Sequence, residues 1–225
     1  MASPSPTGST TLADSLGSSE EPRFTRRDRT AERRRSILDA ALDCYAEGGT
    51  EAVTIEALRA RSNASTGSIY HHFGNKHGVV AALYQTILGD YRQGLSRDLA
   101  QAETARDFVR RIVLFHVRWA ARNPLRARYL HEVRRSPALV PIEADLRRST
   151  GDLLREVGAR LHDFVDAGAV ARLPRQLYAP LIIGPSQEVL RHVLAGRSRL
   201  DLDAVGGEVA EALADAAWRS LEPVE

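Results

Sequence analysis

The chain has 225 residues, 43% of them apolar, and its 31 basic and 29 acidic side chains leave a formal net charge of +2. This length allows one large or two small domains with a substantial core, and the near balance of charge excludes a uniformly basic protein. A single cysteine, Cys44, excludes an internal disulfide and a multi-cysteine zinc site. No apolar run reaches the roughly 18 residues of a membrane span, and no secretory signal pattern is present, so we expect a cytoplasmic protein without a membrane partner.

The N-terminal segment divides into a polar part and a basic part. Residues 1–24 are rich in Ser, Thr, Pro and Gly, so we expect a disordered tail. Six arginines then occur within residues 26–35. A basic stretch of this kind is often a solvated face, but it can also neutralise DNA phosphates without reading sequence. An amphipathic helix should follow and end at Gly48-Gly49, with its apolar face formed by Ile37, Leu38, Ala41, Leu42 and Tyr45.

Residues 54–77 have the pattern of two short helices joined by a tight turn. Thr54 suits the N-cap of the first helix, Asn63 tolerates the left-handed backbone of a sharp turn, and Ser65 suits the N-cap of the second. The outward side of the second helix carries short polar residues and then hydrogen-bonding rings: Thr66, Gly67, Ser68, Tyr70, His71 and His72. Small polar groups at the N-terminal end of a helix allow close approach to base edges in the major groove of DNA.

The residues after this pair support the same interpretation. Gly74 should end the second helix, Asn75 should cap the next one, and Lys76 offers a cation to a phosphate. The alternative is an ordinary helical pair in a bundle, with these side chains merely on the surface. A metal site at His71 and His72 is disfavoured, because adjacent helical side chains point about 100° apart and carboxylates are lacking nearby. We therefore expect no metal and no cofactor.

Four segments between residues 33 and 88 carry a family resemblance. They are Arg35-Ser-Ile-Leu-Asp-Ala-Ala, the Gly48-Gly49 stop, Val53-Thr54-Ile55 and, above all, Ser65-Thr-Gly-Ser-Ile-Tyr-His-His-Phe-Gly-Asn-Lys. Together they resemble the DNA-binding domain of TetR-family transcriptional regulators. The family commonly has Ala at positions 59 and 62, Gly at 63 and Val at 64. Of these departures Arg59 is the most telling, because a small residue there lets the two helices pack closely.

The resemblance implies roles for particular residues. Thr66, Ser68 and His71 would lie at or near base edges. Tyr70, His72 and Lys76 would contact phosphates, and Thr54 would hold the first helix of the pair to the DNA backbone. The full set of DNA-contacting residues that we expect is Arg33, Thr54, Ser65, Thr66, Gly67, Ser68, Tyr70, His71, His72 and Lys76.

From Lys76 onward the apolar spacing is helical throughout, and no strand pattern occurs. Helices are expected at about 76–91, 108–123, 125–135, 141–168, 174–196 and 202–221, with a kink at Gly184-Pro185. The chain should thus be all-α with about nine helices. A disordered tail at 1–24 would precede a three-helix helix-turn-helix domain at 25–88 and a helical regulatory and dimerisation domain at 89–225.

The resemblance also implies two roles for the second domain, namely dimerisation and, often, binding of a small inducer. The last two helices are the candidates for a homodimer interface, with the small residues Ala212, Ala214, Ala216 and Ala217 allowing close approach. Polar and aromatic residues in the middle of helices are the candidates for an inducer pocket: Phe115, His116, Trp119, Tyr129, His131, Tyr178 and Gln187. The alternative for the aromatic residues is an ordinary core.

The sequence thus predicts a non-enzymatic, dimeric, sequence-specific DNA-binding regulator. The leading hypothesis is a repressor that a small-molecule inducer releases from a palindromic operator in double-stranded DNA. One alternative is a DNA-binding regulator without a ligand. Another is a helical small-molecule binder whose DNA-binding part is vestigial. The sequence does not support an enzymatic function, because the chain has no Gly-Xaa-Ser-Xaa-Gly elbow, no phosphate-binding glycine-rich loop and no His-Glu-Xaa-Xaa-His motif.

Overall fold

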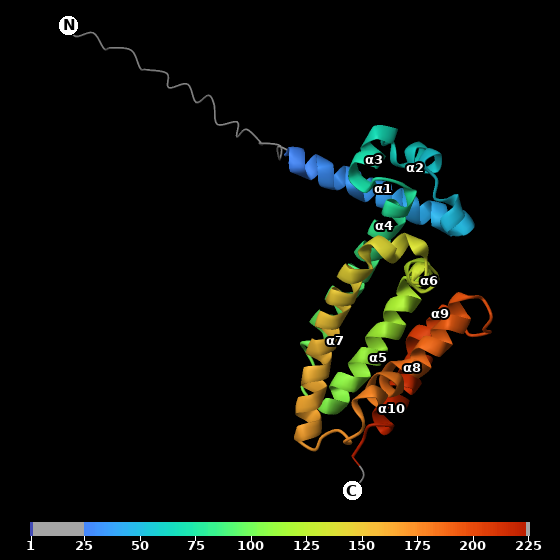
Figure 1. Cartoon of the computed structure of the whole chain (residues 1–225). Helices are drawn as coiled ribbons and strands as arrows, with labels where there is room; N and C mark the ends of the chain where they lie inside the picture. The colour runs from blue at the N-terminus through green and yellow to red at the C-terminus, as the bar shows by residue number, and fades with distance from the viewer. Residues whose placement is uncertain (2–24, 224–225) are drawn as a thin grey trace.

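The structure is a computed structural model that describes residue 1 and residues 25–223 (Figure 1). The tail expected at 1–24 lies, apart from Met1, outside the described residues. Among the described residues no strand occurs, which confirms the expected all-α fold. The helices are α1 (Arg26–Gly48), α2 (Ile55–Ser62), α3 (Thr66–Phe73), α4 (Lys76–Leu99), α5 (Ala105–Arg122), α6 (Pro124–Val133), α7 (Glu143–Asp166), α8 (Arg175–Leu194), α9 (Leu202–Ala204) and α10 (Ala210–Arg219). Two 3-10 segments, η1 (Gly49–Ala52) and η2 (Pro137–Ile142), and a π segment, η3 (Val205–Val209), complete them.

The helices α1, α2, α3 and the beginning of α4 form a head at one end of the molecule, and α4 continues from it into the longer body (Figure 1). The head has its own apolar centre, to which each of its helices contributes at least one fully buried side chain, as Ile37, Leu58, Ile69 and Val79 do. Burial of such side chains holds short helices such as α2 and α3, which would be marginal alone in water.

Part of the head's apolar centre comes from the body. The ring of Tyr129 in α6 is fully buried in this cluster, and its hydroxyl donates a hydrogen bond to the carbonyl oxygen of Val80 in α4 at 2.8 Å. Tyr129 also meets Tyr45 of α1 edge to face, with ring centroids 4.7 Å apart. The Tyr45 hydroxyl in turn donates to the carboxylate of Glu132. These hydrogen bonds and the ring contact connect α6 to both α1 and α4.

The body is built around α5, which packs against α4, α8 and α10. Arginines of α5 form ion pairs with acidic residues of α10, and the Nη2 atoms of Arg110 and Arg118 both lie 2.5 Å from a carboxylate oxygen of Glu211. At the far end, Arg160 of α7 donates to the backbone carbonyl of Leu99, where α4 ends. The guanidinium of Arg160 also stacks over the Phe108 ring at 5.0 Å. These contacts place α7 alongside α4 and α5.

Three expected elements differ in detail. The helix expected at 141–168 begins at Glu143, because the preceding Pro137–Ile142 segment is a 3-10 helix with prolines at 137 and 141. The helix expected at 202–221 is interrupted at Gly207, whose φ of −98° and ψ of −107° are not helical. Two adjacent glycines there favour such a break, since glycine is a poor helix former. By contrast, α8 is assigned as one helix through both Pro180 and Pro185. None of the described helices combines the length and the apolar character needed to cross a membrane.

Candidate nucleic-acid interface

Two N-caps and one left-handed turn residue determine the conformation of the α2–α3 pair. The Thr54 hydroxyl accepts a hydrogen bond from the backbone N–H of Ala57 at 3.2 Å and so caps α2. Asn63, with φ of 51°, makes the left-handed turn. The Ser65 hydroxyl accepts from the N–H of Ser68 at 3.2 Å and caps α3. Two of the expected DNA-contacting residues, Thr54 and Ser65, therefore have a structural task within the pair.

The two sides of α3 differ sharply in burial. Ile69 is fully buried, and Phe73 is partly buried against the same apolar cluster. The opposite side carries Thr66, Gly67 and His71, all exposed, and Tyr70, whose exposure of 49% is large for an aromatic residue. Ser68 and His72 lie partly buried at the margins. The structure thus gathers the outward residues expected from the sequence on one solvent-facing side of α3.

Gly67 has no role in packing within the chain. A Cβ atom built at this position would meet nothing within 4 Å, and its φ is not in the left-handed region. A glycine inside a helix lowers stability relative to alanine by roughly 0.5–1 kcal/mol. A close approach from outside the chain is one physical reason for keeping glycine at this place.

Two arginines of α1 lie beside α3 and hold it in position. Arg33 donates to the backbone carbonyl of Asn63 in the α2–α3 turn at 3.1 Å. The guanidinium of Arg34 stacks over the Phe73 ring, 5.5 Å from its centroid. The sequence indicated Arg33 as a DNA-contacting residue, but it predicted neither of these contacts within the head, because each joins residues far apart in the chain. Both arginines remain exposed, so the edge of the head next to α3 is positively charged.

The histidines of α3 fit an interface better than a metal site. Burial lowers the pKa of His72, and the positive charges of His71, Arg34 and Arg33 lower it further. The His72 ring is therefore neutral near pH 7 and can donate or accept a hydrogen bond. Among the residues that the structure describes, no group of three or more His, Cys, Asp or Glu side chains could hold a metal ion.

Two other expected details concern Lys76 and Arg59. The Lys76 ammonium lies 3.9 Å from a carboxylate oxygen of Glu51, a loose and exposed ion pair that a phosphate can replace. Arg59 is exposed, so its side chain does not enter the α2–α3 contact. Buried Ser62 instead donates to the Leu58 carbonyl at 2.6 Å within α2.

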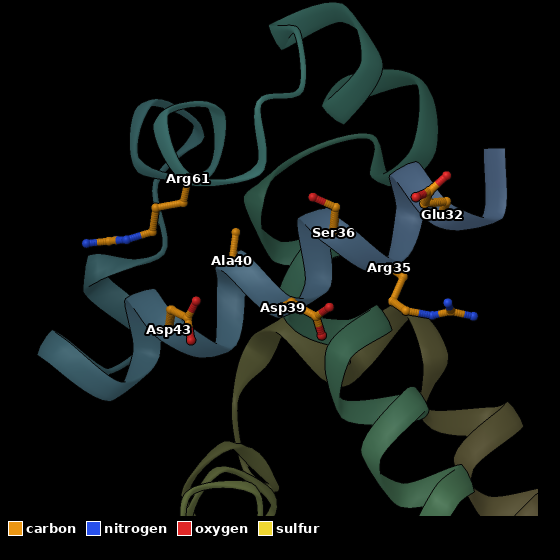
Figure 2. A pocket seen from close by; sticks show the side chains of 7 residues that line it. All are labelled: Glu32, Arg35, Ser36, Asp39, Ala40, Asp43 and Arg61. Carbon is orange, nitrogen blue, oxygen red and sulfur yellow. The ribbon is translucent and has the colours of Figure 1, made fainter. Parts of the chain in front are cut away.

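Another surface of the head is acidic. A shallow hollow of about 360 Å³ on α1 is lined by Glu32, Arg35, Ser36, Asp39, Ala40, Asp43 and Arg61. Figure 2 shows Arg35 and Arg61 at opposite ends of this hollow with Asp39 and Asp43 between them. Arg61 is also bound to Glu47 at 2.6 Å. Carboxylates repel phosphates, so this hollow is not part of the candidate DNA surface.

The expected pocket residues do not come together in one cavity. Phe115, His116 and Trp119 of α5 gather around Tyr91 of α4, with ring centroids 5.0–5.9 Å from that of Tyr91. The Tyr91 hydroxyl lies 2.9 Å from His116 Nδ1, and burial lowers the pKa of His116 to about 4.

The other four expected pocket residues lie elsewhere. Tyr129 is in the head's apolar centre, whereas His131 and Gln187 are exposed. The Tyr178 hydroxyl is held between the carbonyl of Ala171 and the N–H of Leu173, each at 3.0 Å.

The expected dimerisation helices are divided between inner and outer faces. Ile182 and Leu190 of α8 are buried in the protomer's own core, and so are Ala214 and Ala217 of α10. Those two alanines therefore serve packing within the chain. The outer face retains exposed Leu177, Ala212 and Ala216, with Leu181, Val209 and Leu213 partly exposed.

Comparisons with known proteins agree with this geometry. Residues 37–83 match the family "Bacterial regulatory proteins, tetR family". The chain is 34% identical over 73 residues to the HTH-type transcriptional regulator BetI of Burkholderia thailandensis, covering 32% of this chain and 37% of that protein. It is 39% identical over 56 residues to the HTH-type transcriptional repressor AcnR of Corynebacterium glutamicum, covering 25% of this chain and 30% of the relative. The matched segment thus spans about a third of these relatives.

The fold as a whole is similar to that of solved structures. A TetR-family transcription regulator from Marinobacter aquaeolei VT8 superposes with a TM-score of 0.71 at 16% identity, covering 88% of this chain and 100% of that one. The regulator FadR of Bacillus subtilis, solved in complex with stearoyl-CoA, has a TM-score of 0.65 at 21% identity, covering 81% and 98%. A helical head with an exposed recognition helix defines the general class, that of helix-turn-helix proteins. Within that class, the head matches the TetR family of bacterial regulatory proteins over residues 37–83.

Proposed function

We propose that the protein is a dimeric, sequence-specific DNA-binding transcriptional regulator whose α3 enters the major groove. The observation that carries this proposal is the exposed polar side of α3, with Gly67 unconstrained by packing and Tyr70 half exposed. Thr66, Ser68 and His71 would face base edges. Tyr70, His72, Lys76 and the exposed Arg33 would contact phosphates.

The homodimer would form through α8 and α10. A single α3 reaches only one half-site, whereas two protomers related by a twofold axis reach the two halves of a palindrome. The support for this interface is the apolar outer face of the two helices, where Leu177 is 45% exposed and Ala212 and Ala216 leave room for close approach. Burial of this face against a second copy would remove apolar surface from water.

We further propose that the regulator is a repressor released by a small-molecule inducer. AcnR, with which the chain shares 39% identity over 56 residues, is named a repressor, and FadR of similar fold was solved with stearoyl-CoA. An inducer can release DNA only by favouring a different spacing of the two α3 helices. A regulator without a ligand remains the second candidate. The packing of Phe115, His116 and Trp119 around Tyr91 favours it, because aromatic side chains so engaged form a core.

Selection of bound genome fragments by the purified protein, at two salt concentrations, tests the DNA-binding proposal. We expect recovery of one inverted repeat whose affinity falls steeply as salt rises, because phosphate contacts release counterions. Weak binding without sequence preference would refute the specific-regulator proposal. A thermal shift by a ligand that also releases the DNA would separate the inducible repressor from the regulator without a ligand.

A further inference from the structure

Arg92 lies on the body's part of α4, facing α7. Its two terminal nitrogens donate hydrogen bonds to hydroxyls of neighbouring α7 residues, Nη1 to Ser149 and Nη2 to Thr150. The guanidinium is partly buried, and burial lowers its pKa. Both terminal nitrogens therefore point into the contact between α4 and α7, and their hydrogen-bond acceptors there are neutral hydroxyls.

Among the residues that the structure describes, no carboxylate compensates the charge of Arg92. Several arginines of the body have carboxylate partners, as Arg111 has in Asp107 and Arg126 has in Asp90, whereas others such as Arg160 bind backbone carbonyls. Within the described part of the chain, no ion pair involves Arg92, and the phenol of the nearby Tyr84, whose pKa burial raises, is uncharged near pH 7. A cation removed from water without a counter-ion is costly, so an anion from outside the chain would stabilise it.

The surroundings of Arg92 suit an anion that also carries an apolar part. Arg134 adds a second positive charge near Tyr84. Leu88, one turn before Arg92 in α4, and Leu146 and Leu153, one turn on either side of the hydroxyl pair in α7, are only partly buried. A guanidinium with apolar side chains along both neighbouring helices is the general form of a site for an amphipathic anion.

The N-terminal two thirds of α7 are weakly held. Leu161 and Val165, both near its C-terminal end, are its buried side chains among those described, and Leu154 is 59% exposed. The Arg160 contact to the end of α4 fastens the same C-terminal end. The segment that carries Ser149 and Thr150 contributes partly buried side chains, Leu146 and Leu153, to the core, so its movement away from α4 costs less buried apolar surface than movement of the C-terminal end would.

We propose that Arg92, Ser149 and Thr150 bind the oxyanion group, carboxylate or phosphate, of a small amphipathic ligand whose apolar part inserts between α4 and α7. The guanidinium donates both terminal N–H groups to the anion, a bidentate geometry that suits these oxyanions. The Ser149 hydroxyl, which donates to the Asp145 carbonyl at 2.9 Å in the unliganded chain, and the Thr150 hydroxyl then donate to the anion instead. The ligand class follows from a guanidinium that has hydroxyl partners but no carboxylate partner, and from the leucines beside it.

This inference rests on the proposed function for its regulatory meaning, since it identifies the chemical class of the inducer. Arg92 and Lys76 lie on the same helix, 16 residues apart in sequence, which is roughly 24 Å at about 1.5 Å per residue. A ligand that separates α7 from α4 acts directly on the helix that carries the head. Binding itself, however, does not depend on DNA and is measured without it.

The test is calorimetric titration of the full chain with octanoate, octyl phosphate and octanol. We expect at least one of the two anions to bind, and octanol to bind about ten-fold more weakly or worse, the effect of losing a hydrogen bond to a charged group. Arg92→Gln should reduce anion binding by the same factor. Arg97→Gln is the matched control, because Arg97 is an exposed arginine of α4 whose Nε donates to the Gln93 carbonyl of the same helix. The anion that binds more tightly distinguishes carboxylate from phosphate ligands.

Three results would overturn the inference. They are equal affinity for octanol, unchanged anion affinity in Arg92→Gln, and no binding of either anion. If Arg92→Gln does not fold, the double variant Ser149→Ala, Thr150→Ala replaces it, and the same loss of anion affinity is expected. Anion binding by a protein that fails to select an operator would refute the proposed function and leave this site standing. Operator binding without binding of either anion would refute this inference and leave the proposed function standing.

Discussion

Gly78, in the first turn of α4, allows the end of α3 and the start of α4 to approach each other closely where the chain turns. A Cβ atom at this position would lie 1.8 Å from the backbone carbonyl oxygen of Phe73, the last residue of α3. Because the obstacle is backbone, no rotamer change relieves it, and alanine fits only if the corner opens. Gly89 of the same helix is a matched control, since a Cβ there meets nothing within 4 Å.

The expected stabilities follow from these distances. Gly89→Ala should raise the free energy of unfolding by about 0.5–1 kcal/mol, the ordinary gain from replacing a helical glycine. Gly78→Ala should lower it by about 1–3 kcal/mol, the usual range for overpacking. Gly94→Ala should fall between them, because its Cβ would meet the tip of the Phe115 ring at 2.7 Å and a side chain can yield.

Urea unfolding at one fixed protein concentration measures all three variants, since the stability of the proposed dimer would depend on concentration. Operator binding is the second readout, because opening the corner displaces α3, and Gly78→Ala should bind more weakly than Gly89→Ala. If Gly78→Ala were as stable as Gly89→Ala and bound DNA equally well, the close α3–α4 approach would be refuted.

Three further predictions concern pH, the head–body contact and the DNA surface. The folded-state pKa of His116, about 4, lies below its ordinary 6.5, so the unfolded chain binds the proton first and stability should fall as pH drops from 6.5 to 4. The loss should reach at most about 3 kcal/mol and disappear in His116→Phe, as thermal unfolding at neutral and acid pH will show. Tyr45→Phe removes the hydroxyl bonded to Glu132 and should lower the unfolding free energy by about 1–3 kcal/mol in urea. Lys76→Ala should weaken binding equally on all DNA sequences, whereas Thr66→Ala should change the preferred sequence; selection from randomised DNA will reveal an opposite pattern if these roles are misassigned.

The parts of the head predicted from sequence depend on local chemistry. Thr54, Ser65 and Asn75 each cap the helix that follows, and Asn63 makes the left-handed turn as expected. These capping contacts join residues three apart, so a few consecutive residues of the sequence are enough to predict them. The polar outward side of α3 was predictable for the same reason, because Ile69 fixes which side faces inward.

What the sequence did not reveal depends on contacts between distant residues. Tyr129 was expected in a ligand pocket, yet it completes the core of the head through the Val80 carbonyl. An aromatic residue in a helix has the same sequence spacing whether it lines a ligand pocket or packs in a core, so the sequence could not distinguish the two. The pairing of Arg92 with two α7 hydroxyls joins residues 57 and 58 positions apart, and no periodicity in either helix announces it.

The shared core of head and body limits how freely the two can be exchanged. Tyr129, Val133, Ala138 and Leu139 come from the body but are buried in the cluster of α1–α4. A chimaera that joins this head to the body of another regulator would leave a hole in that cluster unless α6 and η2 came with it. The minimal transplantable unit is therefore discontinuous in sequence, and shuffling of recognition helices between relatives should succeed most readily when only the exposed side of α3 is replaced.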